Sequence, residues 1–466
     1  MKTRNTLLYF ISLCWMLTGC GKEFLDIRRD SGQVVPKKAS DYLAILARSN
    51  MFFSSSDLIF LGTDEYYLKS GADLIAGSQY APFHQYAYIW ADDPYGIQSQ
   101  NLSDWNGAYE RIMAANLALD VETLPVQETD GLERDKARVA ARFHRAWNFY
   151  HLAQVFCKVY DQQTAVSVPG LPLRTDYDVS VNYGRSSLAD VYKLILRDLL
   201  EAEQIKLHGD NNTFLPGTLA VQALLARVYL QQGQYDLAFR YADLVLAKKN
   251  DIIDYGQFQG TISDVYSSYF QPYGKDNPSI IFFSYSNVGG ILAPNYGNVD
   301  TLFEKSLESG DLRRKIYFFQ RPDGSRIFTG SYFGNGGNGF FTGLTVEEML
   351  LIRAECHARR GKPGDAINDI NTLRRKRFEK ADYRDIRPEE LSDVLEYVLA
   401  ERRKELYMRG RRWEDARRLN REGKYEITFR KKIDGKEHSL VPGSNKWVWP
   451  IPKNEMDNND IEQNER

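Results

Sequence analysis

Residues 80–101, YAPFHQYAYIWADDPYGIQSQN, combine aromatic rings with carboxylate and amide side chains over a short distance. A sugar ring has an apolar C–H face and a rim of hydroxyls, so this combination suits stacking and hydrogen bonding to a sugar. The alternation Tyr86-x-Tyr88-x-Trp90 predicts a strand that would hold the Trp90 indole on a rigid edge before an Asp-Asp-Pro turn. The candidate ligand-binding residues of this segment are Trp90, Asp92, Asp93, Tyr95 and Gln98.

Two later stretches offer similar side chains. Asn295 and Tyr296 form one group, and Tyr332, Phe333 and Asn335 form the other. For every aromatic residue in these groups, packing of the loop against helices is an alternative to ligand contact. Trp105, by contrast, lies in a Trp-x₃-Tyr helical spacing and is expected in the core.

Catalytic motifs are weak or missing from the sequence. Asp92 and Asp93 could form the carboxylate pair of a glycosidase, but adjacent carboxylates before a Pro-Tyr-Gly stretch are more often turn formers. The run Gly334-x-Gly336-x-x-Gly339 matches the dinucleotide fingerprint. However, the next helix is expected to begin only at Thr345, with Glu348 completing a capping box. We therefore expect no enzyme activity, no cofactor and no metal site.

The N-terminus has the features of an export signal. Lys2 and Arg4 precede an apolar run, Leu7 to Leu17, that is about half the length needed to cross a membrane. Leu17-Thr18-Gly19-Cys20 resembles a bacterial lipobox, in which the cysteine becomes the acylated first mature residue. We expect residues 1–19 to be a lipoprotein signal peptide and Cys20 to carry a lipid anchor. An ordinary signal peptide with a chance cysteine is the alternative.

Charge and cysteine content exclude two classes of protein, namely nucleic-acid-binding proteins and disulfide scaffolds. The 60 Lys and Arg residues nearly balance 62 Asp and Glu residues, so the chain lacks the positive field that nucleic-acid binding needs. Once the signal and the anchor are set aside, Cys157 and Cys356 remain, which is too few for a disulfide scaffold. We expect two buried free thiols, with a single bridge between them as the alternative.

Apolar residues recur every three to four positions through much of the chain, which predicts a mainly α protein. Two blocks share the spacing of a tetratricopeptide helix pair, with Gly233 and Gly361 at the turns. We expect a scaffold of about four such pairs, with loop-rich insertions near 50–101 and 250–343 and a few short strands, in PSIIFFSYS and SRIFTGSYF, forming the ligand face. The expected helical blocks are 39–49, 102–121, 133–158, 187–206, 217–247, 345–378 and 388–420.

The basic run ERRKELYMRGRRWEDARRLNREGK is interrupted by acidic residues at helical spacings. Glu401, Glu405, Glu414 and Asp415 can each pair with an arginine three or four positions away. A solvated, salt-bridged helix pair is therefore a better interpretation than a nucleic-acid site.

The same run resembles the C-terminal signature of the SusD/RagB-like outer-membrane lipoproteins, through Glu401-Arg402-Arg403, Glu405-Leu406, Gly410, Arg412-Trp413, Asp415 and Arg418. Further stretches resemble the same family along the chain: CGKEFLD, DKARVAARFHRAWNFYHLAQVF with GLPL, VEEMLLIRAECHARRGKPGDAINDINTLRRKR and VWPIPKNEMDNN. The residues before Gly410, Met408-Arg409, depart from the family, in which an acidic residue is common there. The sequence predicts that they lie at the surface.

The resemblance implies a non-enzymatic glycan-binding lipoprotein of the outer membrane. Residues 20–466 would form one SusD-like domain, exposed at the cell surface, that captures oligosaccharide or polysaccharide. It would deliver the glycan to a TonB-dependent transporter and have no nucleic-acid partner. Two alternatives stay open, namely a transporter lid for a non-glycan nutrient such as peptide, and a secreted glycosidase.

Overall fold

The computed structural model describes residues 36–54, 57–96, 102–125, 131–207, 212–287, 289–334 and 339–466. Cys20, Gln98 and Asn335 lie outside these residues. Within the described part of the chain, helices form the scaffold and the strands are short, so the prediction of a mainly α fold is confirmed.

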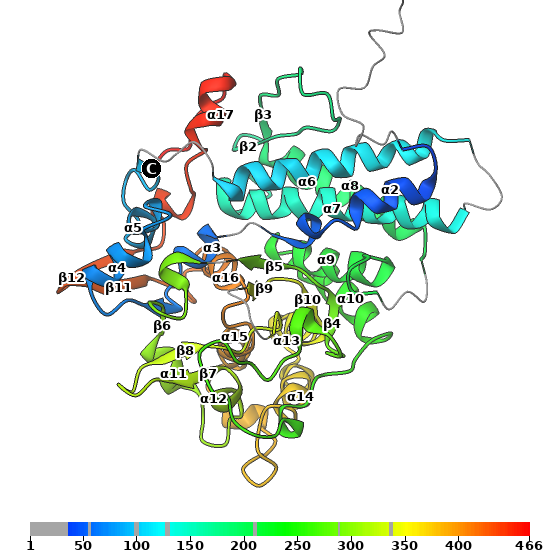
Figure 1. The fold of residues 1–466 in the computed structure, drawn as a ribbon. Coiled ribbons are helices and arrows are strands. Elements are labelled where there is room, and N and C mark those ends of the chain that lie inside the picture. The colour runs from blue at the N-terminus through cyan, green and yellow to red at the C-terminus, as the bar shows by residue number, and fades with distance from the viewer. Residues whose placement is uncertain are drawn as a thin grey trace, which may run out of the picture.

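The long helices form a continuous array in which each packs on the next (Figure 1). The array runs from α2, α6, α7 and α8 at one end, through α9 and α10, to α13, α14 and α15 at the other. These helices are α2 (Ala39–Leu46), α6 (Ser103–Leu119), α7 (Gly131–Phe156), α8 (Leu188–Gln204), α9 (Thr218–Gln231), α10 (Tyr235–Leu246), α13 (Val346–Arg359), α14 (Pro363–Arg374) and α15 (Val394–Glu405). A further helix, α16 (Arg412–Leu419), contacts α9.

The two predicted helix pairs are α9–α10 and α13–α14. Their turns contain Gly233 at φ +73° and Gly361 at φ +69°, a backbone region that glycine enters without steric cost. Ala226 and Ala238 are buried in the first pair, which lets the two helices approach closely. Cys157 and Cys356 are buried free thiols and Trp105 is a core residue, as the sequence predicts.

Short helices and most of the two-stranded antiparallel sheets make up the other side of the molecule, whereas the pair β2–β3 packs on α7 and α8 (Figure 1). The pairs β1–β6, β4–β10 and β5–β9 join segments that are far apart in sequence. The short helices are α3 (Leu58–Leu61), α4 (Gly71–Gly77), α5 (Phe83–Tyr88), α11 (Thr301–Ser306), α12 (Arg313–Ile316) and α17 (Lys453–Asn458). The strands are β1 (Tyr66–Tyr67), β2 (Pro169–Pro172), β3 (Arg185–Ser187), β4 (Ile280–Phe282), β5 (Tyr285–Asn287), β6 (Asn298–Val299), β7 (Phe318–Gln320), β8 (Arg326–Phe328), β9 (Gly339–Phe341), β10 (Leu344–Thr345), β11 (Phe429–Ile433) and β12 (Lys436–Leu440).

The strands expected in PSIIFFSYS and SRIFTGSYF are present as β4, β5 and β8. The strand expected before Trp90 is wrong, because this segment forms helix α5. Its buried residues His84, Ala87 and Tyr88 follow a helical spacing, which the alternation of tyrosines obscured. Trp90 itself follows the helix at φ +52°.

The capping prediction at α13 is half correct. The Thr345 hydroxyl accepts a hydrogen bond from the Glu348 amide at 3.3 Å, as an N-cap should. The Glu348 carboxylate, however, forms a buried ion pair with Arg227 at 2.6 Å instead of returning to the cap.

The basic run forms α15 and α16, but the expectation that it is solvated is wrong. Ion pairs at helical spacing are present, for example between Arg418 and Asp415 at 2.9 Å. Charged groups from distant segments cover the helices as well, and Arg418 also binds Glu355 at 2.6 Å. The prediction of a surface position for Arg409 is wrong too, because its guanidinium is buried 3.8 Å from the ring centroid of Tyr332.

Candidate ligand-binding site

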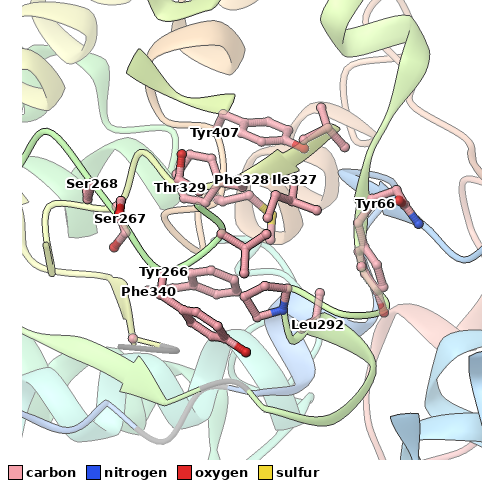
Figure 2. A pocket seen from close by; sticks show the side chains of 18 of the residues that line it. Tyr66, Tyr266, Ser267, Ser268, Leu292, Ile327, Phe328, Thr329, Phe340 and Tyr407 are labelled. Carbon is pink, nitrogen blue, oxygen red and sulfur yellow. The ribbon is translucent and has the colours of Figure 1, made fainter. Parts of the chain in front are cut away.

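A pocket opens among the loops on the strand-bearing side of the molecule, and we call it the loop pocket (Figure 2). Within the part of the chain that the structure describes, its lining carries no charged side chain. The aromatic lining residues are Tyr66, Tyr266, Phe328, Phe340 and Tyr407, and the polar ones are Ser267, Ser268, Asn298, Thr329 and Ser331. Aromatic faces beside uncharged polar groups are the combination that suits a sugar.

The back of the pocket is a fixed aromatic stack. Tyr407 lies parallel to Phe303, with ring centroids 3.8 Å apart, and the ring centroid of Phe328 is 5.4 Å away. The Tyr407 hydroxyl donates a hydrogen bond to the carbonyl of Glu65 at 2.5 Å, which ties this wall to the residue before β1. These rings are held in place before any ligand arrives.

Tyr266 differs from the other aromatic residues because its side chain is 55% exposed. The Asp264 carboxylate accepts a hydrogen bond from the Tyr266 amide at 2.8 Å, so an Asx turn holds the loop that presents the ring. In Figure 2, Tyr266 lies near Phe340 at the opposite side of the pocket from Tyr407. Tyr266 is therefore the lining residue best placed to offer an open stacking face.

The enclosed volume of the loop pocket is about 40 Å³. This is far below the roughly 300–1,000 Å³ of sites that enclose a whole small molecule. The pocket would admit one projecting group, such as a hydroxymethyl, while the sugar ring lies across the mouth.

Polar groups in the pocket are fixed by the backbone. The Ser331 hydroxyl accepts a hydrogen bond from the Phe341 amide at 2.9 Å, which leaves its own proton available as a donor to a ligand. Asn298 is buried, and its amide donates to the Tyr296 carbonyl at 2.8 Å while its oxygen accepts from Arg321 at 2.6 Å. Ser331 thus offers a donor in the lining, and Asn298 is a structural support.

The two later predicted segments do supply walls of the loop pocket, but through neighbours of the predicted residues. Pro294, Gly297 and Asn298 line it beside Asn295 and Tyr296. Ser331 and Gly334 line it on either side of Tyr332 and Phe333.

The predicted aromatic residues in those segments pack against other parts of the protein, Tyr332 fully buried and Tyr296 and Phe333 partly buried. The Tyr296 ring lies against Gly77 of α4. Tyr332 is buried and donates a hydrogen bond to Glu347 at 2.9 Å. Phe333 packs against Tyr285, with ring centroids 4.8 Å apart.

The 90–96 segment lies behind the pocket rather than in it. Trp90 is 1% exposed, and its indole N–H donates to the Gly62 carbonyl at 3.0 Å. The Lys431 ammonium lies 5.0 Å from the Trp90 ring and 4.7 Å from the ring of Tyr66, which lines the pocket. Trp90 thus packs inside the protein, which is the alternative to ligand contact, and it supports the pocket wall from the core.

Its polar neighbours have structural contacts. Tyr95 is buried and its hydroxyl donates to the Pro450 carbonyl at 2.7 Å. The Asp93 carboxylate accepts from the amides of Tyr95 and Gly96, as a turn former does. Asp92 is exposed and ion-paired with Lys446 at 2.7 Å, and the hydrogen bond from Lys446 lowers the pKa of Asp92. The two carboxylates have separate partners and do not face each other as an acid–base pair.

Sequence reasoning missed Tyr266, Ser267, Phe328, Thr329 and Phe340, although all lie in the predicted loop-rich insertion or its edge. The stretch DVYSSYF around Tyr266 does combine aromatic rings with hydroxyls. It lacks a periodic pattern, so nothing in the sequence shows which ring is exposed.

Among the described residues, no helix is both long and apolar enough to cross a membrane. In the same residues no cluster of three or more His, Cys, Asp or Glu side chains is arranged to hold a metal ion.

Comparison with known proteins gives concordant results. A family model described as "Starch-binding associating with outer membrane" matches residues 23–230, and the model of the SusD family matches residues 347–465. A search of curated proteins found no match.

Solved structures share the fold. A putative sugar binding protein from Bacteroides vulgatus is 19% identical with a TM-score of 0.71, over 93% of this chain and 99% of that one. A SusD superfamily protein from Bacteroides thetaiotaomicron is 20% identical with a TM-score of 0.71, over 92% and 100% of the two chains. Another from Bacteroides fragilis is 20% identical with a TM-score of 0.70, over 92% and 99%.

Proposed function

The chain belongs to the SusD/RagB-like family, and on this premise we propose that it is a cell-surface lipoprotein that binds a neutral glycan across the loop pocket without cleaving it. The bound oligosaccharide or polysaccharide would be passed to a partner TonB-dependent transporter in the outer membrane. The observation that carries the proposal is the uncharged lining, to which the exposed Tyr266 contributes an aromatic ring and Ser331 a hydroxyl.

The charge of the lining supports a neutral ligand over an acidic one. A uronic acid or a sulfated sugar would lose hydration on binding, and the lining offers no cation to compensate.

Affinity electrophoresis against a panel of polysaccharides separates these alternatives. We expect neutral polysaccharides such as amylopectin or xylan to retard the migration of the protein. We expect polygalacturonate and casein peptides not to retard it through the loop pocket. Release of reducing sugar that persists after repurification would favour a glycosidase, and retention of peptides alone would favour a non-glycan lid.

Replacing Tyr266 with alanine is expected to weaken binding of the retained glycan by about tenfold to hundredfold. Loss of one stacking ring costs roughly 1–3 kcal/mol, and an exposed side chain contributes little to folding. Calorimetric titration measures the affinity and thermal unfolding checks the fold. Tyr80→Ala is the matched control, because Tyr80 is 93% exposed and does not line the pocket. Equal affinity of the two variants would remove Tyr266 from the site.

Lipid anchoring through Cys20 is part of the same proposal and rests on the lipobox-like Leu17-Thr18-Gly19-Cys20. We expect Cys20→Ala to fold but to move from the detergent phase to the aqueous phase of a partitioning assay. The acyl chains supply the membrane affinity, at about 0.8 kcal/mol per buried CH₂. A variant that stays in the detergent phase would contradict the anchor at this position.

A further inference from the structure

A larger hollow, of about 810 Å³, lies at the start of α9, and we call it the lysine groove. Its walls come from residue 207, residues 212–215 and 217–220, two lysines after α10, and residues 272–278 with the start of β4. The described lining shares no residue with the loop pocket. Its volume falls within the range of roughly 300–1,000 Å³ that is typical of sites for small ligands.

Two exposed aromatic rings line the groove and rest on the same core residue. Phe214 and Tyr273 are 36% and 54% exposed. The ring centroid of Phe283 lies 5.0 Å from that of Phe214 and 6.2 Å from that of Tyr273. Exposed rings in a hollow offer stacking faces to the C–H faces of sugar rings.

The backbone fixes both rings in place before any ligand arrives. The Phe283 amide donates a hydrogen bond to the Thr213 carbonyl, beside Phe214, at 2.8 Å. The Tyr273 amide donates to the Phe333 carbonyl at 2.7 Å, and Tyr273 has a φ of +55°. A bulky residue is uncommon in this left-handed region, and strain of this kind is concentrated at functional sites.

Three lysines make the groove positively charged. Lys248, Lys249 and Lys275 all line it. Within the described residues, no carboxylate oxygen lies within 4.0 Å of any of the three ammonium groups. Lys248 instead donates to the side-chain oxygen of Gln222 at 3.4 Å. The three charges are therefore available to an anionic ligand.

The acidic residues around the groove do not cancel this charge. Asp276 is the one carboxylate of the described lining, and it is exposed. Glu203 already accepts hydrogen bonds from Gln222 at 2.8 Å and from Tyr241 at 3.0 Å. Asp251 is exposed and lies outside the lining. The described lining thus carries three ammonium groups against one carboxylate.

The amino end of α9 adds a partial positive charge to the same wall. Thr218, Leu219 and Ala220 of its first turn line the groove. The N-cap residue is Gly217, which has no side chain to accept hydrogen bonds from the amides of this turn. Because the helix dipole is positive at this end, it favours an anion there.

We propose that the lysine groove binds an acidic oligosaccharide, whose sugar rings stack on the two exposed aromatic residues and whose carboxylate or sulfate groups pair with the lysines. Aromatic faces beside cations suit a charged sugar better than a bare inorganic anion, which has no face to stack. The site is separate from the proposed neutral-glycan site in the loop pocket, whose described lining carries no charged side chain.

Calorimetric titration of the whole protein in neutral buffer, at constant ionic strength, tests the ligand class. The acidic probes are trigalacturonate and a sulfated carrageenan tetrasaccharide, and the comparison probe is hexaglutamate, which has charge but no sugar ring. We expect saturable binding of one equivalent of at least one acidic oligosaccharide, and at least tenfold weaker binding of hexaglutamate. Binding of trigalacturonate alone would identify a uronate as the ligand, and binding of the tetrasaccharide alone a sulfate ester. Failure of both to bind, or equally tight binding of hexaglutamate, would overturn the proposal.

Exposed lysines allow the charges to be tested without threatening the fold. Lys248→Gln combined with Lys275→Gln should weaken binding of the acidic oligosaccharide by roughly fivefold. The matched control is Lys158→Gln combined with Lys380→Gln, because both of these lysines are exposed and lie outside the groove. The control should bind the acidic oligosaccharide as the unmodified protein does.

Tyr273→Asn tests the stacking ring. Asparagine tolerates the left-handed backbone at this position, so thermal unfolding should change little while affinity for the acidic oligosaccharide falls about tenfold. Tyr273→Phe keeps the ring and should keep the affinity. Neutral glycan affinity should be unchanged in all the groove variants. Unaltered affinity for the acidic oligosaccharide in both the double lysine variant and Tyr273→Asn would place the ligand elsewhere and overturn the assignment.

Discussion

Replacing Arg377 with methionine is expected to lower the free energy of unfolding by about 3–5 kcal/mol. The Arg377 guanidinium is completely buried and binds Glu405 at 2.8 Å and Glu347 at 2.9 Å. Burial alone would lower the pKa of Arg377, but Glu405 and the other groups around the guanidinium together outweigh burial and raise that pKa well above its usual value. Without the guanidinium, two carboxylates would be left buried with less compensation.

Urea unfolding of the purified protein measures this loss. The matched control is Arg430→Met, because Arg430 pairs with Glu437 at 2.8 Å on the exposed hairpin β11–β12. An exposed ion pair contributes only about 0–1 kcal/mol, so the control should change little. Similar losses in both variants would contradict the structural importance of the buried network.

Trp90→Ala is expected to cost about 3–5 kcal/mol of stability and to lower the melting temperature clearly. The substitution would leave a cavity beside the Lys431 ammonium and would also remove the indole hydrogen bond to Gly62. Thermal unfolding beside Tyr80→Ala, which removes an exposed ring, separates burial from simple loss of an aromatic side chain.

Glycan titration of the same Trp90→Ala protein, well below its melting temperature, completes this test. We expect the folded variant to retain most of its affinity, because Trp90 supports the pocket without lining it. An unchanged melting temperature together with a tenfold or greater loss of affinity would instead make Trp90 a stacking platform.

The helix pairs could be predicted from sequence because their determinants are local. Ala226 and Ala238 are small enough for two helices to pack closely, and Gly233 between them permits the turn, so the signal lies within one short stretch of sequence. The burial of α15 and α16 could not be predicted in this way. Spacing within the basic run reveals Arg418 beside Asp415, but the partner Glu355 lies on another helix.

The candidate site could likewise be predicted only where its determinants are local in sequence. The loop segments near 295 and 332 could be identified from their aromatic and polar composition, and both reach the loop pocket. Which side chain faces the pocket depends on pairings between distant segments, such as β1 with β6. Tyr332 therefore lies buried against Arg409, while Ser331 beside it lines the pocket.

Hydrogen–deuterium exchange with the neutral polysaccharide that retards the protein most would test glycan binding at the loop pocket most directly. Binding across the pocket predicts slower exchange in residues 264–268 and 326–331, which carry Tyr266 and Ser331, and unchanged exchange in the array α9–α10. Protection confined to residues 90–96, or no protection at saturating polysaccharide, would contradict the proposed site.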